Sequence, residues 1–257
     1  MELNLETKCK ELQHKYNFKL PESGYFIIHC DGRSFSKMIK NRFQKPFDHD
    51  FSDMMDETAV YAAKKIQGCV LTYVQSDEIT FICAVPVESL MFFGGRLCKI
   101  QSIVASLCTA YFNMKYQEWF IKNNKEFKPE YLVQFDCKCW HVPDYTDVME
   151  WLEFRQIDCI RNSKQMLAQY YFSHRELAGY STNQQVELLL AKKNVNWRTE
   201  VYPGHKIGRV FWKVLTDFKT EDGTEYQRHV WEKHTDICFS NEDNMKMFES
   251  LEVIPKL

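Results

Sequence analysis

Two apolar, β-prone runs stand almost end to end in this chain, and they constrain the fold more than any other feature. The runs are CVLTYVQ (69–75) and ITFICAV (79–85), and only Ser76, Asp77 and Glu78 separate them. Both are rich in β-branched and aromatic residues, and so short a polar connection is typical of a tight turn. The pattern therefore predicts an antiparallel β-hairpin with a polar tip.

The segments on either side of this hairpin predict the rest of a core. The run GYFIIHC (24–30) is a predicted buried strand, because it is apolar and ends at the polar breaker Asp31-Gly32-Arg33. Helical spacing of apolar residues follows at about 50–65 and again at about 95–120, and YLVQFDCKCWHV (131–142) supplies a last strand. The order βαββαβ with an antiparallel hairpin is the ferredoxin-type unit. We expect an α+β fold with a palm-like core.

The C-terminal half of the chain predicts a mixed α+β extension. Helical patterns cover about 145–171 and 181–193, and a β-rich hairpin surrounds Asp222-Gly223. We expect residues 1–142 to form the palm-like core. Residues 143–257 are expected to pack on it, so that the whole makes one compact unit.

Composition excludes several classes of protein. The 257 residues are 45% hydrophobic and 26% charged, which is typical of a globular chain and of neither a disordered nor a fibrous one. The formal charge is -2, so a polyanion would have to bind to a local basic patch. No apolar run approaches the roughly 18 residues of a membrane span, and the charged N-terminus does not resemble a signal peptide. We expect free thiols in a reducing compartment, the cytoplasm or the mitochondrion, with the cysteines of apolar runs buried: Cys30, Cys69, Cys83, Cys98 and Cys108.

The predicted fold brings two carboxylates together. The two central strands of a βαββαβ sheet are neighbours, so Asp31 at a strand end and Asp77 at the hairpin tip are expected to meet, with Glu78 beside them. Such a pair can hold two Mg²⁺ ions for in-line nucleotidyl transfer, as in a polymerase palm. Gly32 would let the backbone approach a metal or phosphate, and its carbonyl oxygen is a further candidate ligand.

Phosphate-binding groups can be assigned around these carboxylates. The backbone amides of 33–36 can form a nest for a triphosphate, and Lys45, Arg96 and Lys99 can supply neutralising charge. An ordinary explanation also exists, because Asp-Gly and Ser-Asp-Glu are common turn sequences and a basic pair at i, i+3 is typical of a solvated helix face. Residue types alone leave both interpretations open.

Longer motifs carry a specific resemblance. The stretch FIIHCDGRSFSKMIKNRFQKPFD (26–48) and the stretch YVQSDEITF (73–81) resemble the signature of the tRNA-His guanylyltransferase family, which has DGR-x-F, KP-x-D and QSDE-x-[ST]-F in this order. Arg96 and Lys99 fall where the family has a basic pair, and PDYTDVMEWLEFRQIDCIRNS (143–163) is similar to its helix ending in WRQ-x-D. The resemblance extends over about residues 5–220.

The resemblance implies an enzyme that adds nucleotides to the 5′ end of a tRNA in the 3′-5′ direction. Its implied cofactor is a pair of Mg²⁺ ions, its substrates are GTP, which is preferred, and ATP, and its implied assembly is a homotetramer. Carried over to this chain, the metal ligands are Asp31, Gly32 and Asp77, and Glu78 supports the catalytic site. The implied nucleotide-binding residues are Asp31, Gly32, Arg33, Ser34, Phe35, Ser36, Lys45, Ser76, Asp77, Arg96 and Lys99, with Lys206 a weaker candidate.

One departure from the family pattern affects the substrate. Eukaryotic members continue the WRQ-x-D helix with His-Ile-Asn-Asn, whereas this chain has Ile160-Arg161-Asn162-Ser163. In this it resembles the Thg1-like proteins that repair truncated tRNA 5′ ends by template-directed addition. Repair and guanylylation of tRNA-His both stay open, and Arg161 and Asn162 either contact RNA or face solvent.

Binding of tRNA requires a basic surface, and two other functions compete with the leading one. Another palm-type enzyme such as a nucleotide cyclase, or a catalytically silent RNA-binding homologue, would share the fold. Basic residues near aromatic ones suit phosphate contact and base stacking, although a solvated face over core aromatics explains them equally well. The candidates are Lys37, Lys40, Arg42, Lys192, Lys193, Arg198, Lys206 and Arg209, interleaved with Phe43, Trp197 and Trp212.

Overall fold

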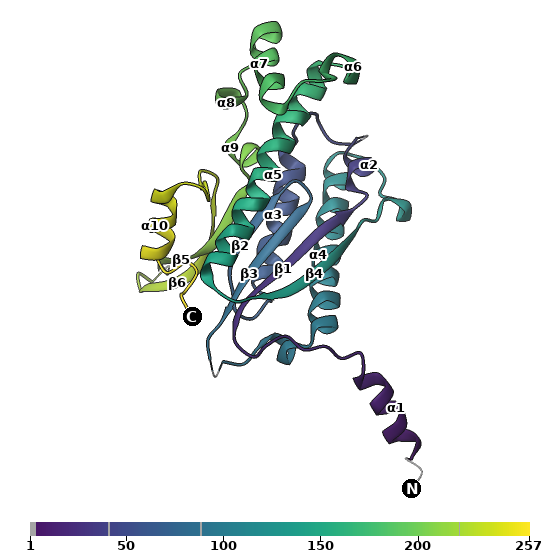
Figure 1. Ribbon diagram of the computed structural model, residues 1–257, viewed down its shortest axis with the longest axis vertical. Helices are drawn as coiled ribbons and strands as arrows, with labels where there is room; N and C mark the ends of the chain where they lie inside the picture. The colour runs from purple at the N-terminus through teal and green to yellow at the C-terminus, as the bar shows by residue number, and fades with distance from the viewer. Residues whose placement is uncertain (1–3, 41, 88, 221) are drawn as a thin grey trace.

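A single antiparallel sheet of six strands organises the molecule, in the order β4-β1-β3-β2-β5-β6 (Figure 1). The computed structural model describes residues 4–40, 42–87, 89–220 and 222–257. β1 and β3 are neighbours at the centre of the first four strands, so the predicted βαββαβ core is confirmed. The strands are β1 (Gly24–Arg33), β2 (Cys69–Gln75), β3 (Glu78–Val85), β4 (Gln134–Val142), β5 (Arg209–Lys219) and β6 (Glu225–His234).

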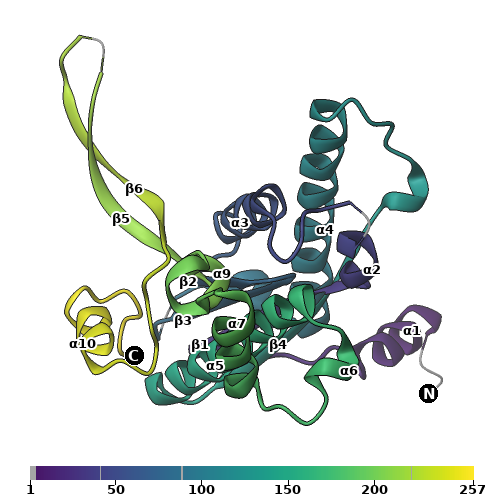
Figure 2. The same ribbon diagram turned by 90° about the horizontal axis from the view of Figure 1, so that it is seen from above.

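Helices cover both faces of this sheet, and Figure 2 shows α3 and α4 on one side with α5 and α10 on the other. The predicted long helix and the helix beginning after Ser181 are both confirmed, and the Ser181 side chain caps the second. The helices are α1 (Leu5–His14), α2 (Phe35–Lys40), α3 (His49–Ala63), α4 (Leu97–Lys122), α5 (Tyr145–Tyr171), α6 (His174–Leu177), α7 (Thr182–Lys193), α8 (Trp197–Glu200), α9 (Pro203–Lys206) and α10 (Glu242–Ser250), with 3-10 turns at Phe92–Gly95 and Pro129–Tyr131.

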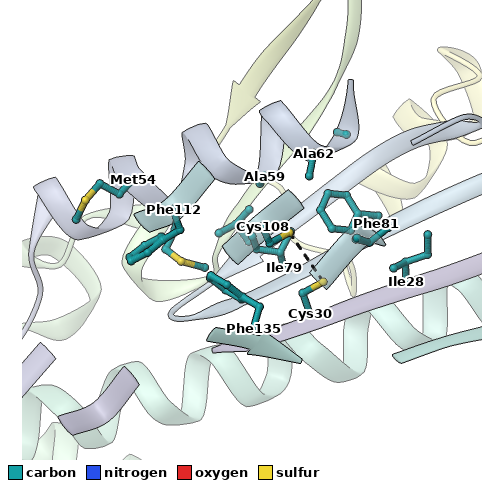
Figure 3. Packing of buried hydrophobic residues seen from close by; sticks show 14 of the residues in the cluster. Ile28, Cys30, Met54, Ala59, Ala62, Ile79, Phe81, Cys108, Phe112 and Phe135 are labelled. Atoms are coloured by element: carbon teal, nitrogen blue, oxygen red, sulfur yellow. Dashed lines mark hydrogen bonds between the residues drawn. The ribbon is translucent and has the colours of Figure 1, made fainter. Parts of the chain in front are cut away.

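Alternation along β1 divides the core into two layers. Phe26, Ile28 and Cys30 point toward α3 and α4, whereas Tyr25 and Ile27 point toward α5 and α10. Figure 3 shows the first layer, in which the Cys30 thiol lies 4.0 Å from the Cys108 thiol among aromatic rings. A strand with apolar residues on both faces needs a helical layer on each side, and this requirement positions the C-terminal helices against the core.

The C-terminal part continues the same sheet. β5 pairs with β2, and the β5–β6 hairpin extends away from the body (Figure 2). The second half of α5 and α6–α8 form a smaller apolar cluster beyond the end of the sheet. In the part of the chain that is described, no helix is long and apolar enough to cross a membrane.

One expectation for the cysteines was wrong. Cys98 is exposed, because it lies on the first turn of α4, whereas Cys30, Cys69, Cys83 and Cys108 are buried as predicted. The apolar Leu90–Phe93 run is divided, with Leu90 exposed and Phe92 and Phe93 packed against the core.

Candidate active site

The end of β1 and the tip of the β2–β3 hairpin meet at one end of the sheet (Figure 1). The turn consists of Ser76 and Asp77, and the Gly32 N–H donates a hydrogen bond to the Asp77 carbonyl at 3.1 Å. In the β1–β3 register Asp31 is directly opposite Glu78. The predicted meeting of the strand end with the hairpin tip is therefore confirmed.

A third carboxylate, from Asp136, joins this group. Asp136 on β4 is directly opposite Asp31, so Asp31 has an acidic neighbour on each adjacent strand. Burial raises the pKa of Asp31, and the charges of Glu78 and Asp136 raise it further. Burial followed by the charge of Asp31 raises the pKa of Asp77 to about 6. Negative charge thus gathers here at an energetic cost that a cation would relieve.

Glu78 differs from the other carboxylates because its charge is balanced. The Arg155 guanidinium of α5 donates to both of its oxygens, at 3.1 and 3.2 Å, and the Gln75 amide donates at 2.8 Å. Arg155 is itself held by Asp158, one turn further along α5, at 2.7 Å. Glu78 therefore connects the hairpin to α5, and the uncompensated charge remains on the aspartates.

His29 is a neutral neighbour of the ion pair between Glu78 and Arg155. Its Nδ1 shares a hydrogen bond of 3.0 Å with the Thr80 hydroxyl, and its Nε2 is 3.7 Å from a Glu78 oxygen. Burial and the nearby Arg155 charge lower the pKa of His29 to about 4. The ring is consequently uncharged at neutral pH and adds no positive charge to the carboxylate cluster.

Both turns of the site contain a non-glycine residue in the left-handed backbone region. Ser34 follows β1 with φ of 61°, and Ser76 stands at the hairpin tip with φ of 45°. Such conformations are costly for residues with a Cβ and persist where the surrounding structure fixes them. The two strained serines therefore lie on either side of the carboxylates.

The DGR-x-F motif has a packing explanation. A Cβ on Gly32 would lie 2.4 Å from Cδ2 of Phe35, so the Phe35 ring occupies the space next to the Gly32 Cα. Phe35 is buried against Phe51, Phe112 and Phe135. The predicted reason for Gly32, a close approach of metal or phosphate, is thus not required to explain a glycine here. Phe35 can offer a ligand its backbone only, whereas Arg33 and Ser36 are exposed.

A pocket of about 120 Å³ opens beside the hairpin tip, between α3 and α5. Aromatic and aliphatic side chains line part of it, and amides, hydroxyls, carboxylates, a guanidinium and a neutral imidazole line the rest. Ser76 and Asp77 stand at its edge. The other lining residues are Ile39, Gln44, Pro46, Phe47, Asp48, Phe51, Ser52, Gln75, Glu78, Cys159, Asn162, Ser163, Met166, Gly204, His205 and Arg209.

The imidazole of His205 forms one wall of this pocket. Its ring stacks on Phe47 at a centroid distance of 5.0 Å, and its Nε2 shares a hydrogen bond of 3.0 Å with the Ser52 hydroxyl. Burial, then the charges of Arg209 and other basic neighbours, lower the pKa of His205 to about 3. The wall is therefore an uncharged aromatic pair with a fixed polar edge.

Arg209 was wrongly predicted to lie on an RNA-binding surface. Only 2% of the residue is exposed, and its guanidinium pairs with Asp56, whose other oxygen contacts Lys233 at 2.6 Å. A further hydrogen bond of 3.1 Å reaches the Gly204 carbonyl. The aromatic residues proposed for base stacking, Phe43, Trp197 and Trp212, are buried as well, so the alternative of core aromatics is correct.

The predicted triphosphate cations are not all near the carboxylates. Lys45 is exposed in the segment that borders the pocket. Arg96 and Lys99 lie at the start of α4, whereas Thr109, thirteen positions beyond Arg96, accepts a hydrogen bond of 3.0 Å from the Phe135 N–H near the start of β4. At 1.5 Å per residue, Arg96 is about 20 Å along the helix from the level of that contact.

The remaining predicted cations have other partners or lie outside the described side chains. Lys206 donates to the Arg198 carbonyl at 2.6 Å and lies over the Trp197 ring. Lys37, Lys192, Lys193 and Arg198 are exposed, and Arg42 is half-buried. The Lys40 side chain is outside the described part of the structure.

Three residues depart from the family's His-Ile-Asn-Asn pattern, namely Ile160, Arg161 and Ser163, and only Ser163 of these lines the pocket. Asn162 and Ser163 line it, and the Ser163 hydroxyl accepts a hydrogen bond of 2.9 Å from the Trp197 indole. Arg161 is exposed and pairs with Asp158, whereas Ile160 packs into the cluster formed with α6–α8. Arg161 thus faces solvent, and Asn162 does not.

Sequence reasoning missed Asp136 and Arg155 as members of the site. Asp136 stands on a strand with alternating exposure, and only the β1–β4 register shows that it is opposite Asp31. Arg155 belongs to the FRQID stretch, whose likeness to the family helix was the available signal. No group of three or more His, Cys, Asp or Glu side chains preorganised for a metal occurs in the described residues.

Comparison with known proteins decides the family. The sequence profile described as tRNA-His guanylyltransferase matches residues 6–143, more than half of the chain. The chain belongs to the tRNA-His guanylyltransferase family. A probable tRNA(His) guanylyltransferase of Dictyostelium discoideum is 24% identical over 230 residues, which are 85% of this chain and 87% of that protein.

Solved structures agree with this membership of the guanylyltransferase family. A bacterial tRNA(His) guanylyltransferase (Thg1)-like protein in complex with ATP has a TM-score of 0.81 and 26% identity, covering 98% of this chain and all of the other. The bacterial Thg1-like structure in complex with GTP gives a TM-score of 0.77 at the same identity and coverage. The protein is therefore an enzyme of the tRNA guanylyltransferase class with a palm-like fold.

Proposed function

We propose that this guanylyltransferase adds nucleotides, GTP by preference, to the 5′ end of a tRNA in the 3′-5′ direction. The observation that carries the proposal is the pair Asp31 and Asp77, whose charges are uncompensated. Asp77 lines the pocket at the hairpin tip, and Asp31 is its neighbour at the end of β1. Growth in this direction joins the 3′-hydroxyl of the incoming nucleotide to the activated 5′ α-phosphate of the RNA. A 5′-triphosphate end releases pyrophosphate in this step. A 5′-monophosphate end must first react with ATP, which releases pyrophosphate and leaves an adenylylated end, and AMP is then the leaving group.

The carboxylates suit Mg²⁺. Mg²⁺ prefers oxygen ligands and is commonly held by one or two carboxylates together with substrate phosphates, which fits a site without three preformed ligands in the described residues. Asp31 and Asp77 would hold the ions, with the Gly32 carbonyl as a third oxygen. When bound, Mg²⁺ supplies the positive charge that stabilises the phosphate groups in the transition state.

The pocket is suited to a nucleoside. Phe47, Phe51 and Met166 offer apolar surfaces for a base, and Gln75 and Asn162 offer amides to its polar edge. The ATP and GTP complexes of the bacterial relative support a nucleoside triphosphate as the ligand. With the base in this pocket, the phosphates would reach the carboxylates and the exposed backbone at Ser34 and Ser36.

We further propose template-directed repair of truncated tRNA 5′ ends as the reaction of this chain. The family motif that accompanies untemplated G addition is altered here at positions 160, 161 and 163, and Ser163 of these lines the pocket. The change of this lining residue alters which contacts a base can make inside the pocket. Base pairing of the incoming nucleotide with the template strand of the tRNA, and not contacts inside the pocket, would then select the nucleotide.

The test measures extension of two 5′-monophosphate tRNAs with NTPs and Mg²⁺. One is full-length tRNA-His, and the other is a different tRNA that lacks its first 5′ nucleotide. We expect preferential extension of the truncated tRNA, and loss of extension with retained tRNA binding in Asp31→Ala and Asp77→Ala. Glu187→Ala, which removes an exposed carboxylate on α7, is the control.

Other outcomes identify other functions. Addition of a single G to tRNA-His alone would overturn the repair assignment and leave guanylylation. Binding of tRNA without extension of either RNA would support a catalytically silent homologue, and formation of a cyclic nucleotide from ATP or GTP would support a cyclase. Near wild-type extension by either aspartate variant would overturn the metal site.

The compartment and assembly follow from the same proposal. All ten cysteines are free, which supports a reducing compartment such as the cytoplasm. The family resemblance supports a homo-oligomer, specifically a tetramer, and sedimentation of the purified protein tests it. A species with the mass of a single chain over the working concentration range would refute the tetramer.

A further inference from the structure

A second hollow, lined by basic residues, lies near the carboxylates, and the function proposed above gives its cations no role. It has a volume of about 530 Å³, larger than the pocket at the hairpin tip. It is formed by the end of β1, α2 and the loop after α4, which Figure 1 shows at the same end of the sheet. We call it the basic groove, and its residues are Arg33, Ser34, Lys37, Met38, Arg42, Glu130, Tyr131, Leu132, Val133 and Gln134.

The charges of this groove are unbalanced. Arg33, Lys37 and Arg42 line it, and Glu130 is the single acidic lining residue in the described part of the chain. None of the three cations has an ion-pair partner among the described residues. On a chain whose formal charge is -2, this is the local basic surface that a polyanion requires.

Two of these cations are held in place by neutral groups. The Arg42 guanidinium lies 4.2 Å above the centre of the Tyr131 ring, and it donates to the Met38 carbonyl at 3.4 Å. Arg33 donates to the Gln134 side chain at 3.2 Å. Neutral partners orient the guanidinium groups and leave their charge available, which suits recognition of phosphate.

The groove and the pocket lie on different sides of the carboxylates. Ser76 and Asp77 border the pocket, whereas Arg33 and Ser34, which follow Asp31 on the chain, border the groove. At about 3.3 Å per residue, Arg33 is roughly 7 Å along the strand from Asp31. A nucleotidyl transfer has two reactants, and this arrangement provides a place for each beside the same two aspartates.

We infer that the basic groove binds the sugar–phosphate backbone of the substrate RNA next to its reacting 5′ end. This inference rests on the proposed function, and it names the surface that holds the RNA strand. The exposed Leu132 and the ring of Tyr131 give the groove an apolar side for a ribose or base, and Lys37 and Arg42 contact successive phosphates. The nucleoside triphosphate occupies the other site.

The test is the salt dependence of tRNA binding without nucleotide, measured by fluorescence anisotropy for Lys37→Ala, Arg42→Ala and the unmodified protein. Each lost phosphate contact is expected to lower the slope of log Kd against log [KCl] by about 0.7 to 0.9. The control is Lys65→Ala, because Lys65 likewise lies over a tyrosine ring, that of Tyr61, beyond the end of α3. We expect Lys65→Ala to leave the slope unchanged.

Extension kinetics separate RNA binding from nucleotide binding. Both groove variants should raise the KM for tRNA several-fold, while the KM for GTP and the rate at saturating tRNA change by less than about twofold. A raised KM for GTP with unchanged tRNA affinity would overturn the inference, because the groove would then hold the nucleotide triphosphate. Equal slopes for all four proteins would overturn it as well. Lys37 is exposed, so its variant keeps the test valid if Arg42→Ala fails to fold.

Failure of the proposed function would give a different set of results from failure of the basic groove. If the unmodified protein extended neither RNA, and the groove variants still lowered the salt dependence of tRNA binding, the RNA-binding groove would be supported and the transferase activity would be refuted. A wild-type protein that extends RNA with no effect of the groove variants on binding would refute the groove alone.

Discussion

Asp77 and Glu78 are adjacent in the sequence and have opposite electrostatic surroundings. Asp77 stands in the hairpin turn, where burial raises its pKa to about 6 and no cation pairs with it among the described residues. Glu78 begins β3 and accepts two hydrogen bonds from Arg155. At the scale of single residues, Asp77 is therefore able to bind a cation, and Glu78 maintains the position of the hairpin against α5.

This difference predicts different kinetics for two isosteric substitutions. Asp77→Asn should lower kcat/KM for tRNA extension by a factor of about 100 or more, because a charge beside the reacting groups is lost. Glu78→Gln should lower it less than about tenfold and should reduce the free energy of unfolding by about 1–3 kcal/mol, because Arg155 loses one of its two carboxylate partners. Extension assays and urea unfolding of both variants measure this. A larger kinetic loss in Glu78→Gln would reverse the two roles.

Gly32 and Phe35 are expected to be energetically coupled. Gly32→Ala places a Cβ against the Phe35 ring, and such overpacking should reduce the free energy of unfolding by about 1–3 kcal/mol. Phe35→Leu removes ring atoms from that contact, so the double variant should lose less stability than the two single losses combined. Urea unfolding of the four proteins gives the coupling energy. Simple additivity would show that the ring does not determine the residue at position 32.

At the scale of elements, the sequence predicted those helices and strands whose formation depends on residues close together in the chain. The hairpin, the long helix after residue 144 and the helix capped by Ser181 were predictable because periodicity and capping residues are contiguous in the chain. The short α2 and the late α10 were not predicted, since a few turns carry little periodic signal. The roles of Asp136 and Arg209 depend on residues distant in the sequence. Asp136 lies opposite Asp31 of β1, and Arg209 pairs with Asp56 of α3. No local pattern reveals these partners.

The contact between α9 and α3 predicts a pH-dependent stability. The pKa of His205 falls from 6.5 to about 3 on folding, so the unfolded chain binds more protons between these values. Stability from this group is complete above pH 6.5 and is lost as the pH falls toward 3, by up to about 1.4 kcal/mol per pH unit.

Urea unfolding between pH 7 and 4.5 measures this effect. His205→Gln should flatten the pH dependence of the free energy of unfolding, and His229→Gln, which changes an exposed residue of β6, should leave it as in the unmodified protein. An equally steep dependence in His205→Gln would assign the effect to other groups, of which His29 is the first candidate because its pKa is also lowered, to about 4.

At the scale of the whole molecule, one glutamine joins three segments. The Gln156 amide on α5 donates to the carbonyls of Ile207 and Ile237, at 2.9 and 2.8 Å, and its oxygen accepts from the Phe239 N–H at 2.8 Å. These segments lie before β5 and after β6, and β5 pairs with β2 of the core. The C-terminal part is thus connected to the core through the sheet and through a fully satisfied buried side chain.

Such connections predict that the core and the C-terminal part unfold together. Gln156→Leu leaves the buried Ile237 carbonyl and Phe239 N–H without partners, so it should reduce the free energy of unfolding by at least about 2–3 kcal/mol. The Ile207 carbonyl keeps its hydrogen bond from the Tyr73 hydroxyl. Because the sheet is shared, far-ultraviolet circular dichroism and tryptophan fluorescence should shift by the same amount in urea and remain coincident. The exposed Gln227→Leu on β6 is the matched control. If Gln156→Leu separated the two transitions, residues 143–257 would be an independent folding unit, and the carboxylate site would not depend on Gln156.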